Sequence, residues 1–333
     1  MKLGCSYFGN RILRHLAQDM KTLANQGFNF IVHTFSEFDL MFHKGNMKDI
    51  VSVTHDAGHE VHLDPWGIGN VFGGEPFSNF AAQNIFTGCQ ELDDGKPAPF
   101  ACPNNPLFRD YMKGWIDAVA QSGADFAFWD EPHFHNPAFL GGRPGRWGCR
   151  CSFCQKLYME SRSAPMPKEE ADDVKAFKRE CLREFVGKLT KWAHEAGLKN
   201  ALCVPPHLGV NEVREHWSLY TDVPHLSILG TDPYWMWQKK PVAMVGEYAV
   251  ELKKLCDEAN LEPQLWIQNC RIEKGREDEI ARAVELAWEA GIKNLATWGI
   301  EGCANESWIT CDDPPKAWEI LVDSFRKWGQ SVK

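Results

Sequence analysis

The stretch "QSGADFAFWDEP" at residues 121–132 shows the local pattern that decides the fold. A polar, helix-like run ends at Gly123, an apolar run follows, and the apolar run closes on Asp130, Glu131 and Pro132. Glycine at this place is typical of the residue that ends a helix in the left-handed backbone conformation. A short continuous apolar run is typical of a buried strand. The pattern therefore predicts a helix that leads into a buried strand, with two carboxylates where the strand ends.

The same pattern recurs along the chain. It returns in "NQGFNFIVHTF", "DAGHEVHLDPW", "EAGLKNALCVPP" and "EAGIKNLATWG", and further apolar runs read "KLGCSY", "LSILGTD" and "EPQLWIQ". The predicted strands lie near 2–7, 28–34, 60–65, 125–130, 199–204, 226–232, 262–269 and 293–298. Strands that alternate with helices in this way predict an α/β fold, a (β/α)8 TIM barrel with its active site at the carboxyl ends of the strands. A doubly wound sheet is the alternative, because repeats alone do not show closure, although "YFGNRI" after the first strand is no glycine-rich phosphate loop.

We expect one barrel domain over residues 1–333, with long loops at about 67–104 and 134–170. Both loops leave predicted strand ends, where long loops usually shape a site.

Charge and composition narrow the class of partner. The net charge is −9 and the 36 Lys and Arg residues are scattered, which argues against nucleic acid or an anionic membrane as a partner. No apolar run has the length of a signal-peptide core or a membrane span, so we expect a cytoplasmic protein unless a leader has been removed. The 14 tryptophans, several of them beside acidic residues at predicted strand ends, favour a small carbohydrate substrate. Homo-oligomerisation is left open.

The side chains expected at the active end are acidic, aromatic and amide-bearing, a mixture that suits a polyhydroxylated ligand. They are Tyr7, His33, Glu37, Asp64, Trp66, Asp130, Glu131, His133, His207, Asp232, Tyr234, Trp235, Gln268, Asn269, Arg271, Trp298 and Glu301. No G-x-S-x-G nucleophile elbow accompanies them.

Two strand ends favour catalysis. Cleavage of a glycosidic bond needs one protonated carboxyl group, and an adjacent Asp130 together with apolar neighbours would raise the pKa of Glu131. Asp232 in "GTDPYWMW" is the candidate partner, as a nucleophile, as a base or as a ligand for a sugar hydroxyl. A plain surface turn at "DEP" is the structural alternative. The residues expected to contact substrate are Asp64, Trp66, Asp130, His133, Tyr234, Trp235, Gln268, Asn269, Trp298 and Glu301.

Histidines near strand ends raise a second hypothesis. His33, His133, His135 and His207 could join carboxylates around a divalent ion, as in a barrel sugar isomerase or epimerase. No H-x-H or H-E-x-x-H pair on one element supports this arrangement, since His133 and His135 are expected in a loop after a proline. A lone histidine is more often a hydrogen-bonding group.

Three cysteines stand within six residues in "CRCSFC" at 149–154. Thiolates at this C-x-C-x-x-C spacing can reach one zinc ion, which takes a fourth ligand to complete a tetrahedron. Cys102 is the candidate fourth ligand, so the predicted zinc ligands are Cys102, Cys149, Cys151 and Cys154. Four buried free thiols are the alternative.

The order "CPNNP" at 102–106, "DEP" at 130–132 and "CRCSFCQKLY" at 149–158 resembles the glycoside hydrolase family 42 β-galactosidases and their relatives in glycosidase clan A. The resemblance implies a (β/α)8 barrel and a structural zinc cluster of the four cysteines. It also implies that Glu131 is the acid/base and that Trp298 is the aromatic residue at the end of strand eight.

Two positions depart from that family. Asp130 stands where the family has Asn, and Gln268 and Asn269 stand where its nucleophilic Glu closes strand seven. The partner of Glu131 must therefore come from another strand, with Asp232 first and Glu301 second.

We therefore expect a glycoside hydrolase with a structural zinc site, acting on a small glycoside or oligosaccharide. A metal-dependent sugar isomerase, epimerase or lyase and a non-catalytic carbohydrate-binding barrel are the alternatives, because one fold hosts many chemistries.

Overall fold

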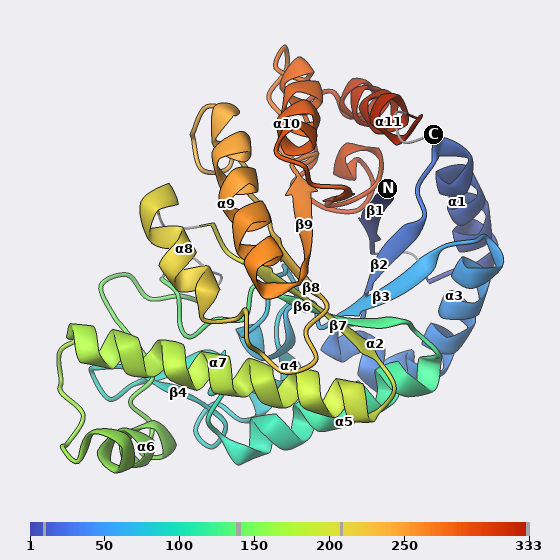
Figure 1. Cartoon of the computed structure of the whole chain (residues 1–333). Helices are drawn as coiled ribbons and strands as arrows, with labels where there is room; N and C mark the ends of the chain where they lie inside the picture. The colour runs from blue at the N-terminus through green and yellow to red at the C-terminus, as the bar shows by residue number, and fades with distance from the viewer. Residues whose placement is uncertain (9–10, 138–140, 207–208, 331–333) are drawn as a thin grey trace.

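A computed structural model describes residues 1–8, 11–137, 141–206 and 209–330. Its parallel strands close into a barrel in the order β1-β10-β9-β8-β7-β6-β3-β2 (Figure 1). Closure is made by β1 and β10, where Lys2 pairs with Asn294 and Cys5 with Thr297. This confirms the predicted (β/α)8 fold and shows that the sheet is not open. The barrel strands are β1 (Lys2–Tyr7), β2 (Phe30–Thr34), β3 (Glu60–Asp64), β6 (Phe126–Asp130), β7 (Lys199–Val204), β8 (Ile228–Thr231), β9 (Glu262–Ile267) and β10 (Asn294–Thr297).

Helices surround the barrel, as Figure 1 shows. They are α1 (Leu13–Gln26), α2 (Glu37–Phe42), α3 (Lys44–Asp56), α4 (Asn79–Gln83), α5 (Pro106–Ser122), α6 (Ser152–Arg162), α7 (Asp172–Glu195), α8 (Val210–Ser218), α9 (Ala243–Ala259), α10 (Asp278–Glu289) and α11 (Pro314–Gln330). The covering helix α10, for example, buries an apolar stripe that consists of Ile280, Ala283, Val284 and Ala287. The predicted glycine stop is present after α5, where Gly123 has φ 83° and ψ 16°.

The inside of the barrel is packed with side chains. Its apolar cluster consists of Phe30, Val32, Phe126, Phe128, Ala201, Cys203, Ile228, Trp266 and Ala296. Gly4 is required beside them, because a Cβ at this position would lie 2.2 Å from the Phe30 ring. Barrel interiors of this kind are cores and not pores, so a site has to form at one end of the barrel.

The two long insertions contain structure of their own. Residues 67–104 include the short 3₁₀ helix η1 (Ile68–Asn70), α4 and the antiparallel hairpin β4 (Cys89–Glu91) with β5 (Pro97–Ala101). The hairpin extends into the second insertion through a bridge between Leu92 and Gly148. Sequence patterns did not predict this hairpin, since β4 is short and β5, "PAPFA", carries two prolines.

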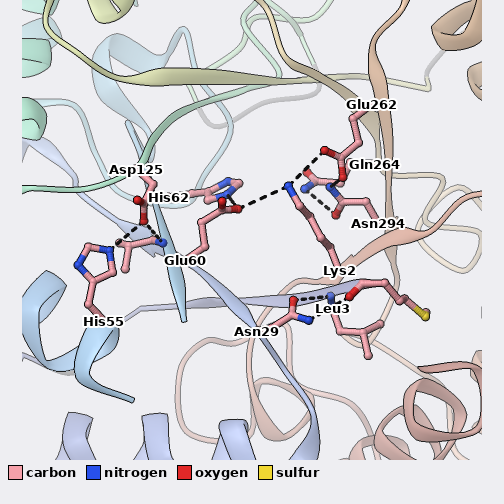
Figure 2. A network of polar contacts seen from close by, with 12 residues as sticks. Lys2, Leu3, Asn29, His55, Glu60, His62, Asp125, Glu262, Gln264 and Asn294 are labelled. Atoms are coloured by element: carbon pink, nitrogen blue, oxygen red, sulfur yellow. Dashed lines mark hydrogen bonds and ion pairs between the residues drawn. The ribbon is translucent and has the colours of Figure 1, made fainter. Parts of the chain in front are cut away.

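A polar network closes the amino-terminal end of the barrel (Figure 2). Lys2 Nζ lies 3.2 Å from Glu262 and 3.7 Å from Glu60, so β1 is tied to β9 and β3. Asn294 donates to Glu262 and accepts from the Gln264 amide at 3.1 Å. These contacts lie at the end opposite to the predicted site.

No helix within the described ranges is both long enough and apolar enough to cross a membrane.

Candidate active site

Four carboxylic acid side chains occupy the carboxyl ends of neighbouring barrel strands. Asp64 is the last residue of β3, Asp130 is the last residue of β6, and Glu131 follows it. Asp232 follows β8, which is separated from β6 only by β7. Asp64 is fully buried, whereas the other three are partly exposed. The barrel thus brings together the acidic residues that the sequence placed at strand ends.

Glu131 and Asp232 form a hydrogen-bonded pair. Burial, and then the negative charge of Asp130, raises the pKa of Glu131 to about 8. Burial and the charges of Glu131 and Asp130 raise the pKa of Asp232 as well. Their mutual hydrogen bond lowers the pKa of Glu131 and raises that of Asp232. The pair therefore holds a proton near neutral pH.

The backbone at Glu131 is unusual. Its φ is 41°, in the left-handed region that non-glycine residues rarely adopt. The conformation is held by Glu131 N, which donates to Cys203 O of β7, and by Glu131 O, which contacts His133 Nδ1 at 2.7 Å. Strained backbone of this type clusters at functional sites, and here it turns the glutamate side chain away from the strand direction.

Asp64 and Asp130 form the other half of the acidic cluster. Both oxygens of Asp64 are buried and receive no hydrogen bond from the described residues. Burial, followed by the charge of Asp130, raises the pKa of Asp64, and burial raises that of Asp130 to about 7. Asp130 packs directly against Gly73, where a Cβ would lie 2.2 Å from Asp130 Oδ2. A buried acid without a donor is a group that a ligand hydroxyl could satisfy.

Asn269 adds an amide at the end of the barrel where the acidic cluster lies. It follows β9, is fully buried, and neither its Oδ1 nor its Nδ2 finds a partner among the described residues. The neighbouring Gln268 is different, because its amide accepts from Met236 N at 3.0 Å and donates to Cys270 O at 2.9 Å. Asn269 is therefore available to a ligand, whereas Gln268 braces two loops.

Three aromatic rings lie in a row beside the barrel mouth. The Phe8 ring lies 5.2 Å from Trp66 and 5.4 Å from Trp298, measured between ring centroids. Trp66 and Trp298 are half-buried, and the Trp66 indole N–H has no partner among the described residues. Sequence reasoning missed Phe8, although its place directly after the first strand is a signal that could have identified it.

A buried glutamate holds this row in position. Glu306 accepts hydrogen bonds from Phe8 N at 3.2 Å and from Ile300 N at 2.8 Å. Burial raises the pKa of Glu306 to about 8. Sequence reasoning also missed Glu306, because it lies nine residues past β10 in a loop with no recognisable motif.

Trp235 does not reach the cluster. It is fully buried and its indole N–H donates to Glu279 of α10 at 2.7 Å, so the ring packs outward and has no face for a sugar. The expectation of a stacking role for Trp235 is therefore corrected. Tyr234, one residue before it, packs on the interior cluster near Asp232.

Glu301 also lies apart from the carboxylates. It is exposed and lines a surface hollow of about 590 Å³ together with Gln26, Trp318 and Arg326. The chain turns there at Gly299 and again at Gly302, both with positive φ, which directs Glu301 toward α11. The expectation that Glu301 could be the second carboxylate is corrected in favour of Asp232.

Other residues expected at the active end face the helices. Tyr7 OH donates to Asp19 of α1 at 2.6 Å, and His33 Nε2 lies 2.9 Å from Thr54 of α3. Glu37 accepts from Gly69 N, Ser78 and Phe80 N and so braces the first insertion. His207 lies outside the described residues.

The four cysteines of the predicted zinc site come together. Their sulfur atoms all lie within 4.8 Å of one another, and Cys102 Sγ is 3.5 Å from Cys154 and 3.6 Å from Cys151. A tetrahedral zinc with Zn–S bonds of about 2.3 Å separates its sulfur ligands by roughly 3.8 Å, so the spacing fits this ion and is far from a disulfide. Asn104 Nδ2 also donates to Cys154 Sγ at 3.3 Å, a hydrogen bond that would orient a metal-binding thiolate.

The cysteine cluster lies away from the carboxylates but is linked to them. Among the described residues, these cysteines are the group of potential ligands close enough to share an ion. Buried Gln90 of β4 donates to Ala101 O and accepts from His135 N, both at 3.0 Å. The hairpin that carries Cys102 is thereby joined to the loop that follows Glu131.

Comparisons with known proteins agree on the fold. No family model and no curated protein matches this sequence. The catalytic domain of a β-amylase from Paenibacillus polymyxa matches with a TM-score of 0.66, at 10% identity over 99% of this chain and 98% of that one. An endo-β-1,4-mannanase from Thermotoga petrophila matches at 0.61, with 8% identity over 100% of this chain and 77% of that one. A D-allulose 3-epimerase from Methylomonas sp. matches at 0.54, with 10% identity over 99% and 97%.

These likenesses show the fold alone, because the sequence identities are low. They show the (β/α)8 barrel, and they do not show membership of family 42. Sugar epimerases share the same architecture, so the fold fits sugar-processing proteins in general.

Proposed function

We propose that residues 1–333 form one barrel domain that hydrolyses a small glycoside or oligosaccharide. The single observation that carries the proposal is the hydrogen-bonded pair of Glu131 and Asp232 at the carboxyl ends of β6 and β8. Two carboxyl groups that share one proton supply both the acid and the carboxylate that glycosidic cleavage needs.

Glu131 is the proposed general acid. In the free protein Glu131 and Asp232 share a proton, and it lies on Glu131 when the glycosidic oxygen of a substrate contacts that side chain. The oxygen then takes the proton from Glu131 as its bond to the anomeric carbon breaks, and the electron pair of that bond leaves with the oxygen. Asp232 is left as a carboxylate facing the anomeric carbon.

Asp232 is the proposed nucleophile. Inverting enzymes keep their two carboxyl groups roughly 6.5–9.5 Å apart to hold a water between them, whereas retaining enzymes keep them at roughly 5–5.5 Å. The hydrogen bond between Glu131 and Asp232 puts the pair nearer to the shorter of these spacings, which favours a bond between Asp232 and the anomeric carbon. Water then cleaves this bond, and Glu131 takes up its proton.

The remaining groups suit a sugar. Trp66 and Trp298 offer half-buried ring faces for the apolar side of a pyranose. Both carboxylate oxygens of Asp64 and the side-chain amide of Asn269 have no partner among the described residues, so they could bind sugar hydroxyl groups. The charge of Asp130 raises the pKa of Glu131. His133 contacts the backbone carbonyl of Glu131, and Tyr234 N donates to the backbone carbonyl of Asp232.

Zinc is the proposed structural ion. Cys102, Cys149, Cys151 and Cys154 would hold it, joining the β4–β5 hairpin to the start of α6. The ion would supply folding free energy at that junction and no chemistry to the substrate.

A metal-dependent sugar isomerase or epimerase is the rival with a clear distinguishing test. It would need a metal near the carboxylates. Of the described histidines in that hypothesis, His133 lies beside Glu131, whereas His33 contacts Thr54 and His135 accepts from Arg143 N at 3.0 Å.

The test is hydrolysis of a panel of aryl glycosides and oligosaccharides by wild type and Glu131→Gln, with and without brief chelation. We expect turnover that survives chelation and, for substrates whose leaving group needs a proton, falls by about 10²–10⁴-fold in the variant. Glu301→Gln is the matched control, since Glu301 is exposed beside α11, and it should leave the rate unchanged. Activity that follows the metal and ignores Glu131 would favour the isomerase; binding without turnover would favour a carbohydrate-binding barrel.

A further inference from the structure

An exposed stack of three side chains stands on the active end of the barrel. The Arg271 guanidinium carbon lies 4.9 Å from the ring centroid of Trp237 and 5.0 Å from that of Trp308. These residues belong to the loops that follow β9, β8 and β10 in turn. Trp308 is 70% exposed and Trp237 is 47% exposed, so the stack meets solvent with large aromatic surfaces.

The backbone holds this stack in place. Arg271 N donates to Ile309 O at 2.8 Å, which joins the loops after β9 and β10. Arg271 has φ 50°, a left-handed conformation that a non-glycine residue adopts only where its surroundings enforce it. The Gln268 side chain accepts from Met236 N and thereby fixes the loop that carries Trp237. The arrangement is built by three loops and does not depend on the two rings alone.

The stack is continuous with the candidate active site. Asn269 and Arg271 are separated only by Cys270, which packs in one cluster with Phe8, Cys303 and Ile309. Trp66 and Trp298 pack against the same cluster. A chain of sugar units with one unit at the carboxylates can therefore continue past the aromatic row to Arg271.

Within the described residues, the contacts of the Arg271 guanidinium are those with the Trp237 and Trp308 rings, and no acidic side chain forms an ion pair with it. Stacking on the indole faces restrains the guanidinium plane and leaves its N–H groups, which lie in that plane, free to donate to a ligand. A planar arginine fork presented in this way matches the two oxygens of a carboxylate.

We propose that Trp237, Arg271 and Trp308 form an outer subsite for a carboxylate-bearing sugar unit, a uronic acid, of an oligosaccharide. The tryptophans contact the ring of this unit and Arg271 binds its carboxylate. The inference rests on the proposed function, because it assumes that the adjoining unit occupies the site of Glu131 and Asp232.

The experiment measures binding of a uronic-acid trisaccharide by calorimetry in a Glu131→Gln background, which slows hydrolysis. The comparison ligand is the same trisaccharide with its carboxyl groups reduced to hydroxymethyl groups. We expect tighter binding of the charged form, and Arg271→Gln should weaken it by about tenfold or more while changing the reduced form little. Trp308→Ala should weaken both forms, and the preference for the charged form should shrink as salt is added.

Lys293→Gln is the matched control. Lys293 also lies over a tryptophan ring, that of Trp288, but at the amino-terminal end of β10. It should leave both affinities unchanged. Equal affinity for the two ligands, or no effect of Arg271→Gln on the charged one, would overturn the subsite. Turnover of the trisaccharide by the wild type reports the proposed function separately, so each idea can fail alone.

Discussion

At the scale of single residues, the assignment of acid and nucleophile makes different demands on Glu131 and Asp232. A leaving group of low pKa needs no proton, whereas the bond to the anomeric carbon is needed for every substrate. Glu131→Gln should therefore lose activity on alkyl glycosides and retain much of it on dinitrophenyl glycosides. Asp232→Asn should lose both activities. Initial rates on paired substrates test this, and the opposite pattern would exchange the two roles.

The shared proton also sets a pH limit. Since the pKa of Glu131 is raised to about 8, chiefly by burial, the acid form is present below that pH and is lost above it. We expect kcat/KM to fall as pH rises through about 8. Asp130→Asn removes the second cause of the elevation, so the alkaline limb should move to lower pH. A profile that stays in place in this variant would contradict the electrostatic link.

The same shift predicts a stability cost. Burial raises the folded-state pKa of Glu131 above its ordinary value, so the folded protein holds a proton that the unfolded chain releases. Folding stability should therefore fall as pH rises from about 4.5 toward 8. Glu131→Gln has no such proton, and its Tm should fall less over this window in thermal scans from pH 5 to 9.

At the scale of elements, the cysteine cluster joins the β4–β5 hairpin to the loop before α6. We expect about one zinc per chain by elemental analysis. Cys151→Ser should lose the zinc and lower Tm by several degrees, because the metal-binding free energy is folding free energy at this junction. Cys256→Ser, a buried thiol of α9 outside the cluster, should keep the zinc. Full thiol titration of metal-free wild type with an unchanged Tm would end the proposal.

Sequence patterns predicted elements well where packing follows a simple period. The five helices that end at a glycine and the strands that follow them could be predicted, because a C-cap and a buried apolar run are local signals in the sequence. The β4–β5 hairpin was not, since its order comes from Gln90, the Leu92–Gly148 bridge and the cysteines, which lie far apart in the sequence. The predictions for Trp235 and Glu301 were wrong because the backbone dihedral angles after a strand end decide whether a side chain faces the barrel mouth or the helices.

At the scale of the whole molecule, closure of the barrel could be expected but not read from the sequence. The β1–β10 pairing is made between the two ends of the chain, and no local pattern reports it. The grouping of Asp64, Asp130, Glu131 and Asp232 follows from closure, because only then do β3, β6 and β8 share one mouth. Phe8 and Glu306 were missed for the same reason: their contact joins the first strand's exit to the last loop.

Closure also separates stability from chemistry along the barrel axis. Asn294 lies at the amino-terminal end, where it donates to Glu262 at 2.8 Å and accepts from Gln264. Asn294→Ala leaves the amide N–H of buried Gln264 without this acceptor, so it should lower the free energy of unfolding by about 1–3 kcal/mol. Because the carboxylates occupy the opposite end, kcat and KM of the folded variant should stay at wild-type values. Urea unfolding tests the loss of stability, and steady-state kinetics on the same preparation test the unchanged kcat and KM. A change in kcat with unchanged stability would show that the two ends are coupled through the packed interior, contrary to this division.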